Sequence, residues 1–118
     1  MYSQTFWEHV RHPRNNRPLT GAQTGEARYH RCGDRLNLYL TIENGRITQA
    51  TFQAKACAPV VAVASLATEM IQGLEISELG KLDIFQIEKE LGGLPPSKRH
   101  AYLLFIECLH AALKKSES

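Results

Sequence analysis

Apolar and polar residues alternate most regularly near the middle of the chain. Leucine or isoleucine occupies every second position from 36 to 42, with Asn37, Tyr39 and Thr41 between them. A period of two is typical of a strand with one buried face and one solvated face. The pair Asn44-Gly45 follows, and these residue types readily adopt the positive backbone angles of a tight turn. The pattern therefore predicts a β-hairpin with a return strand over residues 47–54.

The return strand changes parity once along its length. Its apolar positions are Ile47 and then every second residue from 50 to 54. One extra residue in a strand produces such a shift, so we expect a β-bulge there. Strand-like sequence also begins earlier, near Glu26, after an irregular stretch that reaches Thr24. The first half of the chain is therefore expected to supply about three strands.

Helical periods dominate the second half, although a short amphipathic helix is also expected over residues 2–10. The His12-Pro13 step ends that first helix, because a residue before proline is pushed out of the helical region. Residues 60–72 are almost wholly apolar and run from a proline to Gly73, which predicts a buried helix with a glycine cap.

Two further helices are predicted after this buried one. Asp83 is a suitable cap for a helix that ends at Leu91, before two glycines. The last helix follows Leu94-Pro95-Pro96 and runs to about residue 114. Its apolar stripe consists of Ala101, Leu104, Phe105, Cys108 and Ala112. Strands followed by helices indicate an α+β fold, with helices packed over one face of a small antiparallel β-sheet.

Length and composition narrow the class of protein. The 118 residues, 43% of them apolar and 22% charged, are enough for one core, so we expect a single domain over residues 1–118. A net charge of +2 gives no reason to expect a nucleic-acid partner. The start of the chain lacks the features of a secretory signal, and the longest apolar run, 57–67, is far shorter than the ~20 residues of a membrane span. The sequence predicts a cytoplasmic protein with no membrane partner.

Side chains that could bind a metal or take part in a reaction are expected at the open end of the predicted hairpin. Cys32 and Asp34, separated by Gly33, precede its first strand, and Cys57 follows its second. Because the strands pair through the turn, their outer ends meet, and the glycine permits a sharp bend there. His100 begins the last helix and would face the same rim if that helix crosses the sheet.

The residue types at this rim leave two interpretations open. Two thiols, a carboxylate and an imidazole suit tetrahedral zinc or the irons of a small cluster. An odd number of cysteines at irregular spacing also favours thiols or metal ligands over disulfides. No short C-x-x-C spacing occurs, however. The second interpretation, in which Cys32 and Cys57 are half-buried residues with no ligand role, therefore has the same weight as metal binding. Cys108 is expected in the core, and no partner pattern surrounds His9, His12, His30 or His110.

Four segments occur in the order found in a known family. They are His12-Pro13-Arg14-Asn15, Cys32-Gly33-Asp34, Ala56-Cys57 and Leu94-Pro95-Pro96-Ser97-Lys98-Arg99-His100. They resemble, respectively, the N-terminal motif, the first and second cysteine motifs and the leucine-proline-proline-x-lysine motif of the U-type iron-sulfur cluster scaffolds, the NifU/IscU-like proteins. The likeness is collinear from about residue 10 to residue 113.

The resemblance implies a SufE/NifU-like fold and a scaffold or carrier rather than an enzyme. It implies that a transient 2Fe-2S cluster is held by Cys32, Asp34, Cys57 and His100 and is passed to recipient apo-proteins. A cysteine desulfurase is implied as the sulfur donor, and an Hsp70-type chaperone as a partner at residues 94–98. A homodimer that shares one cluster is compatible with two thiolates from each chain.

Two departures from the family pattern support a second hypothesis. Ala101 follows His100 directly, where the family has its third cysteine, a cluster ligand and sulfur acceptor. Ala56 and Ala58 replace the glycines that flank the second cysteine, Cys57, and stiffen that loop. The alternative is a module of the same fold that assembles no cluster and holds zinc or regulates the desulfurase. A thiol-dependent enzyme with His100 as base lacks any accompanying substrate motif.

Overall fold

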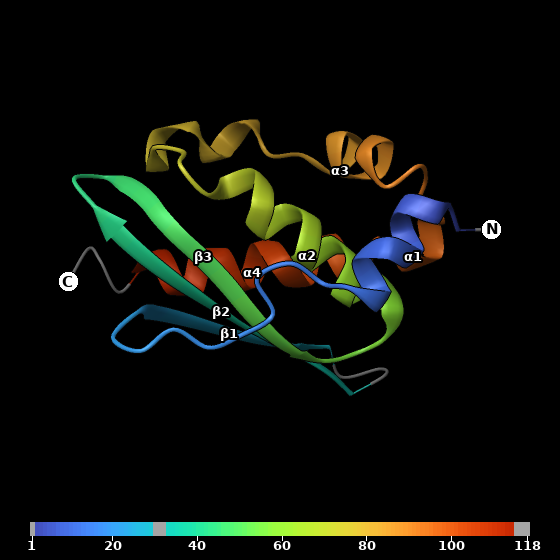
Figure 1. Cartoon of the computed structure of the whole chain (residues 1–118), viewed down its shortest axis with the longest axis horizontal. Coiled ribbons are helices and arrows are strands. Elements are labelled where there is room, and N and C mark those ends of the chain that lie inside the picture. Colours follow the sequence, from blue (N-terminus) through green and yellow to red (C-terminus); the bar gives the residue numbers. More distant parts are fainter. Residues whose placement is uncertain (1, 30–32, 115–118) are drawn as a thin grey trace.

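A sheet of three antiparallel strands, in the order β1-β2-β3, supports the helices of this protein (Figure 1). The computed structural model describes residues 2–29 and 33–114. The elements in chain order are α1 (Gln4–Arg11), β1 (Gln23–Tyr29), β2 (Asp34–Glu43), β3 (Arg46–Lys55), α2 (Ala58–Ile71), the 3-10 helix η1 (Ile76–Lys81), α3 (Ile84–Glu90), the 3-10 helix η2 (Pro96–Lys98) and α4 (His100–Lys114). The α+β class predicted from the sequence is confirmed.

The central hairpin has the turn and the bulge that its sequence predicts. Both residues of the turn at 44–45 have positive φ values, 53° and 75°. Thr41 faces Gln49, whereas Ile42 faces Ile47, so β3 has one extra residue beside the turn. The bulge keeps apolar side chains on the helix side of the sheet despite the change in parity.

Helix α4 packs closely against β1 because Gly25 has no side chain. A Cβ atom at this position would lie 2.0 Å from the carbonyl oxygen of Cys108 and 2.6 Å from the backbone nitrogen of Ala112. No larger residue fits this strand position without moving α4. The strand begins at Gln23, slightly earlier than the sequence indicated, and so includes this close contact.

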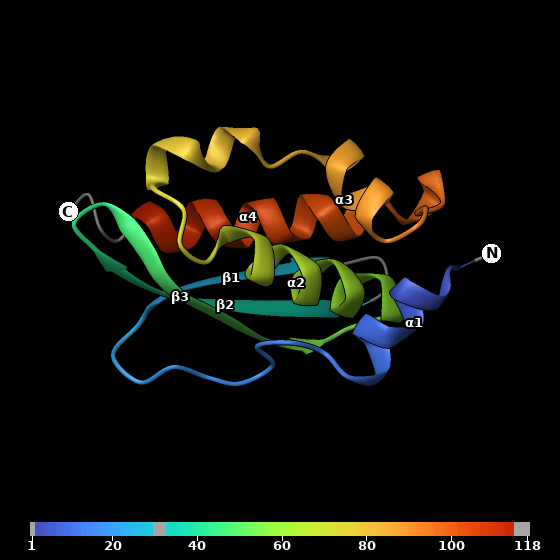
Figure 2. The same ribbon diagram turned by 45° about the horizontal axis from the view of Figure 1, so that its top comes forward.

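Helices and an irregular segment lie on opposite sides of the sheet. Figure 2 shows α2 and α4 over one face, while the segment between α1 and β1 passes along the other. The backbone N–H of Phe52 in β3 donates to the carbonyl oxygen of Asn15 in that segment, at 2.9 Å. Helix α2 contacts α1, α3, α4 and β3, which explains why its sequence is almost wholly apolar.

The predicted helix ends are largely confirmed. Asp83 caps α3 by accepting the backbone N–H of Gln86 at 2.8 Å. Gly73, just beyond α2, has a φ of 88°, and the whole predicted apolar stripe of α4 is buried. Helix α1 is shifted slightly toward the C-terminus relative to the prediction, and η1 was not predicted. Within residues 2–29 and 33–114, no helix has the length and apolar character needed to cross a membrane.

A buried polar contact joins α1 to α2. His9 is 6% exposed, and its Nδ1 lies 2.7 Å from Oγ of Ser65, which also accepts the backbone N–H of Arg14 at 2.8 Å. Its other ring nitrogen lies 3.9 Å from the carboxylate of Glu69. No sequence pattern marks these partners, because Ser65 and Glu69 on α2 are more than 50 residues away from His9 along the chain.

Candidate metal centre

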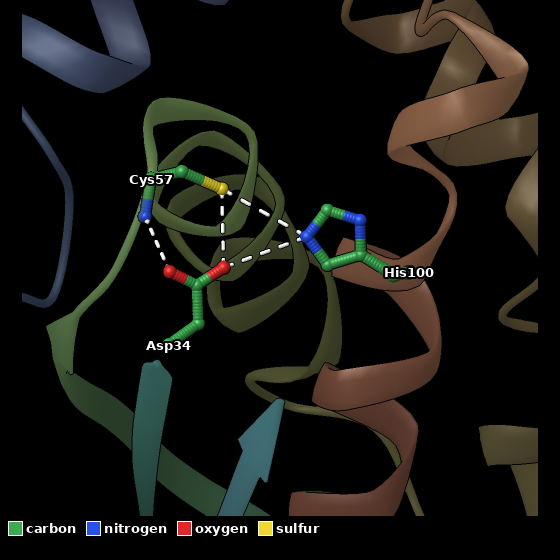
Figure 3. A group of neighbouring side chains, drawn as sticks. All are labelled: Asp34, Cys57 and His100. Carbon is green, nitrogen blue, oxygen red and sulfur yellow. Dashed lines mark hydrogen bonds and ion pairs between the residues drawn. The ribbon is translucent and has the colours of Figure 1, made fainter. Parts of the chain in front are cut away.

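Asp34, Cys57 and His100 converge at the open end of the hairpin, as Figure 3 shows. Asp34 is the first residue of β2, and Cys57 lies two residues beyond the end of β3. His100 is the first residue of α4, which crosses the sheet on its helix side. The structure thus brings together three of the four side chains singled out in the sequence.

The carboxylate of Asp34 holds Cys57 through two contacts. Its Oδ1 accepts the backbone N–H of Cys57 at 3.0 Å, and its Oδ2 accepts from Sγ at 3.2 Å. Cys57 is also the N-cap residue of α2, without a side-chain capping bond. Negative charge is favoured at the N-terminus of a helix, so the carboxylate of Asp34 is well placed beside the start of α2. Gly33, with a φ of 72°, supports the bend that precedes Asp34.

His100 completes the group from the opposite side. Its Nε2 lies 3.8 Å from Sγ of Cys57 and 3.5 Å from Oδ2 of Asp34. The imidazole is also stacked on the ring of Tyr29, with centroids 4.3 Å apart and an angle of 14° between the planes. This stack fixes the plane of the imidazole, so that one ring nitrogen is directed at the thiol and the carboxylate.

Tyr29 is a positioning residue that sequence reasoning missed. Tyr29 is the last residue of β1 and pairs with Asp34 of β2 in the sheet. It therefore lies beside Asp34 and also stacks on His100. The backbone N–H of Gly33 donates to the Tyr29 carbonyl oxygen at 3.0 Å. Only the strand register reveals this role, because an aromatic residue at a strand end carries no specific signal.

The spacing of the donor atoms is close to that of a tetrahedral metal site. With metal-ligand bonds of about 2.0–2.3 Å, neighbouring donors of a tetrahedron lie about 3.3–3.8 Å apart. The three separations here are 3.2, 3.5 and 3.8 Å. The side chains of His100 and Asp34 are only 13% and 5% exposed, so the group is largely shielded from water. One sulfur, one oxygen and one nitrogen donor therefore fit zinc or one iron of a small cluster.

The remaining predicted residues behave differently. Cys32 and His30 lie outside the described residues, and the ligand role of Cys32 stays a prediction. Ala101, which follows His100 in α4, is fully buried. Cys108 is also fully buried, and its Sγ–H donates to the carbonyl oxygen of Leu36 at 3.1 Å. Burial, reinforced by Glu107, raises the pKa of the Cys108 thiol to about 12, so it remains protonated. The predicted core role of Cys108 is confirmed.

A three-stranded sheet with helices on one face and a thiol, a carboxylate and an imidazole at its open end defines a small α+β protein with a candidate metal centre. The family model described as the NifU-like N terminal domain matches residues 1–118. The chain belongs to this family, as its motifs indicated.

Named relatives agree with this assignment. The chain is 34% identical over 114 residues to the iron-sulfur cluster assembly scaffold protein IscU 1 of Archaeoglobus fulgidus, covering 96% of this chain and 74% of the relative. It is 38% identical over 118 residues to the iron-sulfur cluster assembly enzyme IscU of Drosophila melanogaster, covering 96% and 76%. The nitrogen fixation protein NifU of Nostoc is 37% identical over 101 residues, which is 84% of this chain and 34% of that protein.

A solved structure supports the fold. The N-terminal part of a NifU-like protein from Brucella abortus superimposes with a TM-score of 0.72, covering 96% of this chain and 94% of that one. Its sequence is only 18% identical, so the likeness concerns the fold alone.

Proposed function

We propose that this chain is an iron-sulfur cluster assembly scaffold or carrier, and not an enzyme. The observation that carries the proposal is the convergence of Asp34, Cys57 and His100 in a chain of this family. The relatives named as IscU scaffolds support it at 34% and 38% identity over most of the chain. The cluster is cargo that the protein holds for a time and then releases.

A site with mixed sulfur, oxygen and nitrogen donors suits transient binding of an iron-sulfur cluster. A 2Fe-2S cluster prefers thiolates, whereas the carboxylate of Asp34 is a hard oxygen ligand and binds soft iron-sulfide centres weakly. With Cys32 as the fourth ligand, the site would offer two sulfur donors instead of the four that a permanent centre commonly has. Such a cluster dissociates more readily, which serves transfer to a recipient apo-protein better than storage.

The partners we propose follow from this function. A cysteine desulfurase would supply sulfur at the open end of the hairpin, in the cytoplasm. An Hsp70-type chaperone would contact the segment from Leu94 to Lys98. In that segment Leu94 is 7% exposed, whereas Ser97 is exposed, so a chaperone that grips the leucine needs this segment to open locally.

One observation favours a second candidate function, a module that holds zinc and assembles no cluster. Ala101 follows His100 in α4 and brings no thiol to the group, and its side chain is fully buried. The three donor separations also match a single tetrahedral ion. Such a module would act on the desulfurase without accepting its sulfur.

Anaerobic reconstitution tests the proposal. The chain is incubated with iron, cysteine, a desulfurase and a thiol reductant that converts persulfide sulfur into sulfide, and iron, acid-labile sulfide, zinc and the visible spectrum are measured. Iron and sulfide in equal amounts, lost in Cys32→Ser and in Cys57→Ser, support the scaffold. Zinc alone, or no metal, overturns it in favour of the second candidate. A higher yield in Ala101→Cys would identify the missing thiol as the limiting defect.

A further inference from the structure

Three cations form one row across the sheet beside the candidate metal centre. Arg28 of β1 faces Arg35 of β2, and Arg35 faces Lys55 of β3. All three side chains are exposed and belong to the sheet face opposite α2 and α4. Since neighbouring strands are about 4.8 Å apart, this cationic row extends over about 10 Å.

The cationic row is unfavourable for the isolated chain. Like charges directly opposite each other on neighbouring strands repel and lower the stability of a sheet. Arg28 is compensated by Glu26, whose Oε1 lies 3.1 Å from its Nε. Across the described parts of the chain, neither Arg35 nor Lys55 is joined to any carboxylate. The whole chain has a net charge of only +2, so this concentration of positive charge is a local feature.

The cationic row adjoins the candidate metal centre. Arg35 directly follows Asp34 in β2, and Lys55 is separated from Cys57 by a single residue. A shallow surface depression of about 200 Å³ is lined by Arg28, Tyr29, Gly33, Asp34 and Arg35, and so connects the row with the edge of the site. A molecule bound on the row would therefore lie beside the open end of the hairpin.

We propose that the cationic row docks an acidic patch of a protein partner and orients that partner toward the Asp34-Cys57-His100 group. The inference rests on the proposed function, since a scaffold must bring donor or recipient proteins to its cluster. Complementary charge speeds such encounters and selects their orientation. A protein fits better than a nucleic acid, because the row is short and a chain with a net charge of only +2 offers no extended basic surface for a continuous phosphate backbone.

A charge-reversal experiment tests the docking surface. The test variant is Arg35→Glu/Lys55→Glu, and the matched control is Lys81→Glu/Lys89→Glu, which reverses two exposed lysines on η1 and α3. The probe is a fluorescent peptide of eight glutamates, titrated at low and at physiological salt. We expect about tenfold weaker binding for the test variant, no change for the control and weaker binding of all forms at high salt.

Further measurements make the outcome decisive. Backbone amide NMR shifts caused by the peptide should cluster at Arg28, Arg35 and Lys55, and Arg35→Gln/Lys55→Gln should melt no lower than the natural chain. Equal peptide binding by the test and control variants would overturn the inference. Binding of an eight-nucleotide oligo-dT at the row, in preference to the peptide, would also overturn it and indicate nucleic acid.

Failure of the proposed function is measured separately. Chemical reconstitution with iron and sulfide, without any partner protein, reports on the ligands alone. If the natural chain forms no cluster, the scaffold proposal fails whatever the peptide does. If the test variant forms as much cluster as the natural chain yet binds the peptide unchanged, only the docking inference fails.

Discussion

The carboxylate of Asp34 accepts two hydrogen bonds from Cys57, which lies 23 residues further along the chain. One comes from the backbone N–H of Cys57 at 3.0 Å and the other from its Sγ at 3.2 Å. Together they tie the start of β2 to the start of α2. The thiol and the carboxylate are therefore already in place before any metal binds, and only His100 must be positioned by a third element.

Replacing Asp34 with asparagine should weaken metal binding while preserving the shape of the site. The amide oxygen can still accept the backbone N–H of Cys57, but the negative charge and one acceptor are lost. We expect the Kd for zinc, measured by calorimetric titration, to rise at least about tenfold. Glu43→Gln, the same chemical change at the far end of β2, should leave the Kd unchanged. An unaltered Kd in Asp34→Asn would exclude this carboxylate as a ligand.

The stack of Tyr29 on His100 should contribute to metal affinity. Tyr29→Leu removes the aromatic face and releases the imidazole, and a stack of this kind is worth about 0.5–1.5 kcal/mol. We expect zinc affinity to fall about two- to tenfold, with broadened His100 ring signals in NMR spectra. Tyr29→Phe keeps the ring and should behave like the natural chain. If the phenylalanine variant is as weak as the leucine variant, the hydroxyl group is responsible and the stack is not.

The two described cysteines should separate metal binding from stability. Cys57→Ser should lose bound metal, while thermal unfolding of the metal-free protein changes little. Cys108→Ser places a hydroxyl in the apolar interior beside Leu36, and we expect unfolding to become about 1–3 kcal/mol easier with metal content unchanged. Calorimetric melting and metal analysis of both variants measure this contrast. Metal loss in Cys108→Ser without destabilisation would contradict the core assignment.

His9 should make stability depend on pH below its ordinary titration range. Burial and, next, the positive charge of Arg14 lower the pKa of His9 from 6.5, although Glu69 and Glu8 partly oppose this. The unfolded chain therefore takes up a proton before the folded one does. Stability from the neutral imidazole is fully present above pH 6.5 and is lost as pH falls from 6.5 toward the lower pKa of the folded state.

Melting curves of the natural chain and of His9→Gln between pH 7.5 and pH 5 test this dependence. Glutamine cannot titrate and still offers hydrogen-bonding groups to Ser65, so its melting temperature should fall less over the same interval. Parallel curves for the two proteins would show that another group causes any loss at low pH.

Much of the fold was predictable because its signals are local. The alternation at 36–42 and the Asn44-Gly45 turn determined the hairpin, and the parity change in β3 indicated its bulge. The meeting of Asp34 and Cys57 followed from the hairpin alone, since antiparallel pairing returns the second strand to the start of the first.

The tertiary structure decided the rest, for a physical reason. His100 reaches the site because α4 packs along β1 and β2, and the burial of His9 requires α1 to pack on α2. Likewise, the alignment of Arg28 with Arg35 and Lys55 depends on the strand register. Local backbone preferences and the burial of apolar faces act over a few residues and can be read from the sequence. Contacts between distant residues depend on how whole elements pack, and a single sequence does not display that packing.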